Sequence, residues 1–158
     1  MRTGPSIKRH QSKQTYSTPD DFMRAVIGRF GPIDFDLAAS KENTKAKRFY
    51  DEQRNSLKQD WRKLKGNLWL NPPFSDIAPW ARKCAMSVTP NNCILFLTPA
   101  SVDSNWFSDY IIRKAIVYAL NPRLSFDCQN PYPKGLMLSV FFSLIDRGYQ
   151  DFQVWKWR

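Results

Sequence analysis

The residues best suited to chemistry form one short run, Asn71-Pro72-Pro73-Phe74, which directly follows a strand expected at residues 67–70. Neither proline can donate a backbone hydrogen bond, and both fix the local backbone. The turn therefore presents an amide oxygen and a backbone carbonyl oxygen beside an aromatic ring. Two oxygen acceptors suit an exocyclic amino group, and a ring face suits a planar base. A purely structural turn with a core Phe is the alternative.

The charge of the chain favours a polyanionic partner. Its 158 residues include 24 Lys plus Arg against 14 Asp plus Glu, a net charge of +10. Such a basic domain is attracted to nucleic acid, and 11 Phe, 6 Tyr and 6 Trp offer surfaces on which bases stack. His10 is the only histidine, and Cys84, Cys93 and Cys128 have no short spacing, so we expect no metal site and no histidine base.

The pattern along the chain predicts an α/β domain that positions the turn. Strand and helix signals alternate up to Leu120, which indicates a mainly parallel sheet with helices on both faces. A helix is expected to begin at Thr18-Pro19, with Thr18 as its cap, and to stop at Gly31. Further helices are expected at 76–88 and 106–114, strands at 33–37, 67–70, 93–97 and 115–120, and a β-rich end at 123–126, 136–144 and 152–157.

Two regions lie outside this alternation. Residues 1–15 are basic and lack acids, and we expect a flexible arm there, followed by a single domain over 16–158. Residues 41–65 carry many charges and are expected to be irregular or short-helical. No apolar run approaches the roughly 18 residues of a membrane span, and the first residues do not form a secretory signal. We therefore expect a cytoplasmic protein with no membrane partner.

Asn-Pro-Pro-Phe resembles the Asp/Asn-Pro-Pro-Tyr/Phe signature of S-adenosylmethionine-dependent methyltransferases that act on amino nitrogens. An ordered set of further segments is similar to the phage-type DNA N6-adenine methyltransferases of the Dam family, over about residues 17–144. These segments are Thr18-Pro19, residues 35–40 with Asn43 and Phe49-Tyr50, residues 57–61, residues 97–100 with Asp103, Trp106 and Phe107, and residues 121–126.

The resemblance implies a Rossmann-like methyltransferase fold with an antiparallel C-terminal element, and it implies roles for individual residues. Asn71, Pro72, Pro73 and Phe74 would be catalytic. Asp36 would hold the amino group of the cofactor, beside a small turn without the usual glycines, although it could instead cap a turn. The implied cofactor-binding residues are Thr18, Pro19, Asp36, Leu37, Ala38, Ser40, Asp60 and Trp61.

Some assignments stay open. Asp60 and Trp61 would lie near the adenine of the cofactor, but Asp60 could simply pair with Arg62 or Lys63. Asp51 and Glu52 are both candidates for the acid that holds the ribose. The residues expected to bind nucleic acid are Lys45, Lys47, Arg48, Lys58 and Arg123.

The implied function is transfer of a methyl group from S-adenosylmethionine to the N6 amine of an adenine flipped out of double-stranded DNA, in the host cytoplasm if a phage encodes the chain. Asn71 replaces the commoner Asp of adenine-specific DNA enzymes, although its amide oxygen can serve as the acceptor. Two alternatives remain. One is an RNA methyltransferase acting on adenine N6 or guanine N2, and the other is a basic nucleic-acid-binding domain without catalysis.

Overall fold

The computed structural model describes residues 17–126, 130–143 and 151–158. The basic arm expected at 1–15 lies outside these residues, as does the end of the strand expected at 136–144. None of the helices in the described part of the chain has the length and apolar character needed to cross a bilayer.

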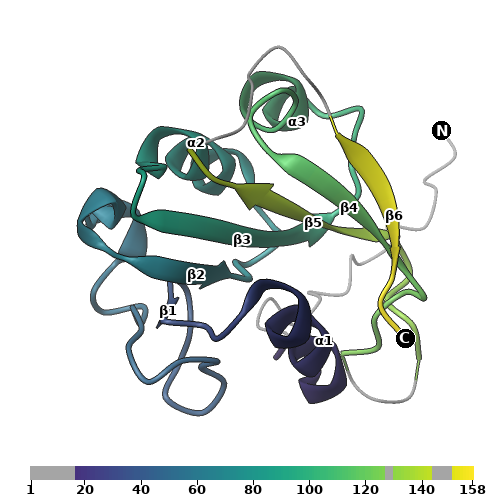
Figure 1. Ribbon diagram of the computed structural model, residues 1–158, viewed down its shortest axis with the longest axis horizontal. Coiled ribbons are helices and arrows are strands. Elements are labelled where there is room, and N and C mark those ends of the chain that lie inside the picture. Colours follow the sequence, from purple (N-terminus) through teal and green to yellow (C-terminus); the bar gives the residue numbers. More distant parts are fainter. Residues whose placement is uncertain (1–16, 127–129, 144–150) are drawn as a thin grey trace, which may run out of the picture.

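A six-stranded sheet forms the centre of the fold, in the order β1-β2-β3-β5-β4-β6 (Figure 1). Five strands run in one direction, and β5 runs antiparallel to both of its neighbours, β3 and β4. The expected antiparallel C-terminal element is therefore present, inserted inside the sheet rather than at its edge. The strands are β1 (Phe35–Asp36), β2 (Gly66–Leu70), β3 (Asn92–Pro99), β4 (Ile116–Asn121), β5 (Leu136–Phe141) and β6 (Phe152–Lys156).

Helices cover both faces of this sheet, as the alternation predicted (Figure 1). The helix α1 (Asp20–Phe30) lies on one face, where Phe22 and Val26 pack with Trp69 of β2. The helices α2 (Ala78–Ser87) and α3 (Asn105–Tyr110) lie on the other, where Leu68 and Leu70 of the same strand are buried. Because both faces are covered, the central strands are almost entirely apolar.

The charged segment 41–65 is mostly irregular, as expected, and contains the short 3-10 helices η1 (Ser56–Lys58) and η2 (Trp61–Lys63). Two strand predictions need correction. The strand expected at 33–37 has only two residues, Phe35 and Asp36. Residues 123–126 form no strand and belong instead to the loop between β4 and β5.

The beginning of α1 also differs from the prediction. Pro19 is the N-cap residue, and no side chain of the described residues caps the helix, so Thr18 is not its cap. Asp20 and Asp21 occupy the first turn, where carboxylates favour the helix dipole. The helix ends at Phe30, and its C-cap residue is Gly31, whose φ of 95° suits glycine. The hydroxyl of Thr18 is therefore available for a contact outside the helix.

Candidate active site

The Asn71–Phe74 turn lies at the carboxyl edge of the sheet, where the sequence placed it. Leu70 is the last residue of β2, and Asp36 is the last residue of the parallel neighbour β1. Because the carboxyl ends of parallel strands share one edge of the sheet, the turn and Asp36 both lie at that edge. Ligands of open α/β sheets bind at this edge.

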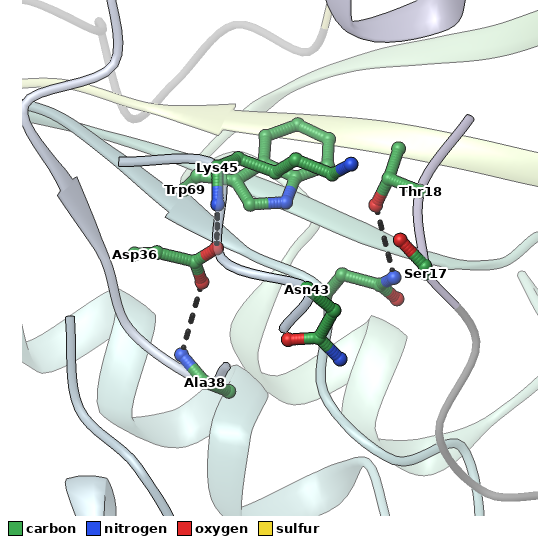
Figure 2. Close-up of a pocket in the computed structure, with 8 residues that line it drawn as sticks. Ser17, Thr18, Asp36, Ala38, Asn43, Lys45 and Trp69 are labelled. Carbon is green, nitrogen blue, oxygen red and sulfur yellow. Dashed lines mark hydrogen bonds between the residues drawn. The ribbon is translucent and has the colours of Figure 1, made fainter. Parts of the chain in front are cut away.

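A polar hollow opens beside the turn, and its volume of about 220 Å³ includes space open to solvent (Figure 2). Segments from α1, β1 and β2 meet here although they are far apart in the sequence. Its lining residues are Ser17, Thr18, Asp36, Ala38, Asn43, Lys45, Trp69 and Asn71. Of the predicted cofactor-binding residues, the structure brings Thr18, Asp36 and Ala38 together here.

A hydrogen bond links the first catalytic candidate to the start of α1. The Asn71 side-chain nitrogen donates to the Thr18 hydroxyl over 3.1 Å, across 53 positions of sequence. The bond holds the Asn71 side chain at the residue that precedes α1 and its N-cap. Because a hydroxyl both donates and accepts, Thr18 can hold either end of the amide group.

Asp36 is the buried acid of the hollow, with 2% of its surface exposed. One carboxylate oxygen accepts from the Lys45 backbone N–H over 2.9 Å, and the other from the Ala38 backbone N–H over 3.3 Å. Burial raises the pKa of Asp36 to about 6, although both N–H groups and the Lys45 charge act to lower it. Asp36 thus organises the turn and also presents a carboxylate to the hollow.

The chain returns to the outer side of β1 after this turn. The Asp36 N–H donates to the Arg48 carbonyl and the Tyr50 N–H donates to the Asp36 carbonyl, both over 2.9 Å. A parallel bridge joins Asp36 and Phe49, so residues 48–50 run along β1. Asp51 follows directly, and its carboxylate accepts from the Arg54 N–H over 3.0 Å. Both ribose candidates, Asp51 and Glu52, follow directly on this segment.

Ser40 and Asn43 close the small turn that carries Ala38. The Ser40 N–H donates to the Asn43 side-chain oxygen over 2.7 Å, and the Asn43 N–H donates back to the Ser40 carbonyl over 3.3 Å. These reciprocal bonds hold the turn in shape without glycine. Asn43 lines the hollow itself, whereas Ser40 is not one of its lining residues.

An aromatic cluster surrounds the other end of the turn, at Phe74. The ring of Phe74 makes edge-to-face contacts with Phe126 and Tyr132, at centroid distances of 6.4 and 5.9 Å. Both partners belong to the loop between β4 and β5. A hydrogen bond links the two ends of this loop, because the Arg123 guanidinium donates to the Pro133 carbonyl over 3.2 Å. Phe74 is partly buried, between the two halves of the core.

Several predicted cofactor residues do not line the hollow. Leu37 and Trp61 are fully buried in the core under α2. The Trp61 indole N–H donates to the Ser56 carbonyl over 3.0 Å, and its ring stacks on Trp80. Asp60 caps η2 and pairs with Arg62 over 3.0 Å, which is the surface pairing kept open above. The contact of Asp60 and Trp61 with the adenine of a cofactor stays a prediction, because neither residue lines the hollow.

The predicted nucleic-acid contacts divide into two groups. Lys47, Arg48, Lys58 and Arg123 are exposed, and Lys58 lies on η1 beside α2. Lys45 is different, because only 14% of its side chain is exposed and it lines the hollow. Its ammonium lies 3.2 Å from the Asp20 carboxylate. The structure therefore places Lys45 with the cofactor candidates rather than with the other surface cations.

Four residues that line the hollow were not among the predicted cofactor-binding residues: Ser17, Asn43, Lys45 and Trp69. Trp69 could have been found, because strand alternation predicts that it faces the side of α1. Lys45 gave no signal in a segment crowded with charges. The complete hollow offers a carboxylate, an ammonium, a hydroxyl and an amide, which together suit a zwitterionic ligand.

Comparisons with known proteins identify the family of the chain. The chain matches the family model for DNA N-6-adenine-methyltransferase (Dam) over residues 6–136, which is most of its length. A DNA N-6-adenine-methyltransferase of Escherichia phage T1 is 37% identical over 97 residues, which are 61% of this chain and 40% of that protein. Another, from Haemophilus phage HP1, is 35% identical over 97 residues, covering 60% and 54%. The matches span about half the length of each relative. The chain belongs to the DNA N-6-adenine-methyltransferase (Dam) family.

Proposed function

We propose that the chain transfers a methyl group from S-adenosylmethionine to the N6 amine of adenine in DNA. One observation carries this proposal. The Asn71–Phe74 turn stands between a charged hollow and an aromatic cluster, at the edge of the sheet where ligands bind. The names of the relatives and the family support the choice of adenine and of DNA.

The hollow fits the amino-acid end of the donor. That end carries an ammonium and a carboxylate, and Asp36 is a buried acid able to accept from the ammonium. The hollow is small and partly open to solvent, so it suits one end of the donor rather than the whole. When bound, S-adenosylmethionine supplies an electrophilic methyl group.

The chain's own residues prepare the amino group for attack. The lone pair of an adenine amine is delocalised into the ring, so the amine is a weak nucleophile. The Asn71 oxygen and the Pro72 carbonyl would accept its two hydrogens and stabilise the positive charge that develops on nitrogen. Phe74 would stack on the base and fix its orientation. A proton then leaves the nitrogen to water, so no histidine or metal is needed.

DNA geometry sets a further requirement. The amine of a paired adenine is not accessible in this way, so the target base must leave the duplex. Exposed cations near the carboxyl edge, such as Lys47 and Arg48, would hold the phosphates while this occurs. The fold proposed for this chemistry is a Rossmann-like methyltransferase domain, which the five co-directional strands and the reversed β5 support.

Identification of the product tests the proposal. The chain is incubated with S-adenosylmethionine carrying an isotopically labelled methyl group and with either duplex DNA or RNA, and the digested nucleosides are separated by mass spectrometry. We expect labelled N6-methyladenine in the DNA. Label in RNA adenine N6 or guanine N2 would assign an RNA enzyme instead. Nucleic-acid binding with no labelled product, and no thermal shift with the cofactor, would refute an enzymatic role.

A further inference from the structure

Lys45 differs from its basic neighbours in where its charge lies. The lysines at positions 41, 47, 58, 63 and 65 are exposed, whereas 86% of the Lys45 side chain is covered. In Figure 2 this side chain extends from the side of Asp36 toward Thr18, with its ammonium at the far end. A cation held inside a hollow is poorly placed to follow a phosphate backbone, so the DNA contact expected from the sequence does not suit it.

Backbone hydrogen bonding fixes Lys45 relative to Asp36. The Lys45 N–H donates to one Asp36 oxygen over 2.9 Å, so the two residues occupy one wall of the hollow. The side chain then carries the ammonium away from Asp36, to the beginning of α1, where Asp20 accepts over 3.2 Å. The hollow thus holds a negative group and a positive group at separate places, rather than as one ion pair.

The contact with Asp20 leaves the ammonium able to bind a ligand. The side chain of Asp20 is 85% exposed, and ion pairs with an exposed partner contribute little stability. An ammonium has three N–H donors, so a second carboxylate can be added without breaking the first contact. Asp20 therefore positions the Lys45 ammonium, which can still donate to a ligand.

We propose that Lys45 binds the carboxylate of the amino-acid end of S-adenosylmethionine, while Asp36 binds its ammonium. This inference rests on the proposed function, because it assumes that S-adenosylmethionine is the methyl donor. It assigns Lys45 to cofactor selection and removes it from the DNA-binding surface. The pair would favour ligands that carry both charges over those that have only one.

The test pairs a change in the protein with a change in the ligand. S-adenosylmethionine and its decarboxylated analogue are titrated calorimetrically into the wild-type chain, Lys45→Met and Lys47→Met, without nucleic acid. Lys47 is an exposed lysine of the same segment and serves as the control. The backbone N–H to Asp36 survives in Lys45→Met, and melting curves check that the variant is folded.

We expect the wild-type chain and Lys47→Met to bind the decarboxylated analogue about ten- to a hundredfold more weakly than S-adenosylmethionine, because the analogue cannot form one charge-assisted hydrogen bond. Lys45→Met should bind both ligands with nearly equal affinity, and Lys45→Arg should keep the preference. If Lys45→Met still prefers S-adenosylmethionine to the decarboxylated analogue, the proposed role of Lys45 is wrong, while the proposed function stands. A wild-type chain that binds S-adenosylmethionine without any preference also overturns it, whereas failure to bind S-adenosylmethionine overturns the proposed function with it.

Discussion

The two sides of the Asn71–Phe74 turn are held by different kinds of interaction. On the Asn71 side, buried charge and hydrogen bonds join α1, β1 and β2, with Asp36 and Thr18 at fixed positions. On the Phe74 side, aromatic rings from one loop meet edge to face. Charge discriminates between ligands by their charged groups, and rings discriminate by planarity and thickness. The difference suggests that one side selects the methyl donor and the other accepts a base.

Asn71 joins the two sides, so its replacement should have the largest effect. Asn71→Ala removes an oxygen that matters most when the substrate nitrogen becomes cationic. We expect single-turnover methyl transfer to fall about 10²–10³-fold while cofactor affinity stays within a few-fold. Asn71→Asp is the matched control, because its carboxylate keeps the acceptor and the Thr18 hydroxyl can donate to it. A folded Asn71→Ala variant with near-normal turnover would remove the turn from the active site.

The charged side should respond to pH through Asp36. Burial raises the pKa of Asp36 from 3.8 to about 6, so the carboxylate form is lost as the pH falls through that value. Only the carboxylate accepts from an ammonium, so each pH unit below about 6 should weaken binding of S-adenosylmethionine roughly tenfold. Calorimetry across this range checks the effect, with Asp36→Asn as the control. If cofactor affinity depends on pH equally in the wild-type chain and in Asp36→Asn, the group that titrates is not Asp36.

The same shift affects folding with the opposite dependence on pH. The native carboxyl binds its proton more tightly than the unfolded one, whose pKa is 3.8. Ionising Asp36 therefore lowers the free energy of unfolding as the pH rises from about 4 to about 6. The loss of stability on ionising a buried acid is explained if the carboxylate binds the ammonium of a ligand.

A smaller effect is expected at Thr18, which orients Asn71 without contacting the base. Thr18→Val keeps the shape and removes the acceptor of the 3.1 Å bond, so turnover should fall about two- to tenfold. Thr18→Ser should restore it. In an Asn71→Ala background the Val substitution should have no further effect on turnover. Additive losses would show that Thr18 acts on the reaction by a route independent of Asn71.

The smallest effect concerns DNA and involves neither side of the turn. Replacing Lys47 and Arg48 by Ala should lower the salt slope of duplex binding by about 0.9 for each phosphate that these side chains no longer neutralise. Lys63 and Lys65 are exposed, precede β2 at the opposite edge, and provide a control with the same change in charge. Equal slopes for the two double variants would place the DNA elsewhere on the surface.

Local patterns predicted much of the fold. The apolar residues of β2 and β3 appear where expected, because strands covered on both faces are continuously apolar. The stop at Gly31 followed from backbone chemistry alone. The position of Asn71 also followed, since the end of a strand in a parallel sheet defines an edge.

Contacts between distant segments explain what the sequence could not provide. Thr18 has the features of a helix cap, yet its hydroxyl accepts from Asn71, 53 positions away. Lys45 looks like any other lysine of its segment until the chain returns along β1 and directs it inward. Trp61 has the character of a stacking residue, but neighbouring Ser56 and Trp80 hold it in the core. Each outcome depends on packing rather than on a local pattern.

A crossed titration tests the division of the site most directly. Binding of S-adenosylmethionine without DNA, and capture of an adenine-containing duplex at saturating cofactor, are measured for Asp36→Ala and Phe74→Ala, with melting curves alongside. We expect Asp36→Ala to weaken cofactor binding about ten- to a hundredfold and to leave DNA binding nearly unchanged. Phe74→Ala should weaken duplex capture by roughly 1–3 kcal/mol without weakening cofactor binding, and Phe74→Tyr should be tolerated. If both Ala variants weaken the binding of both ligands equally, the cofactor side and the base side of the turn are not separate.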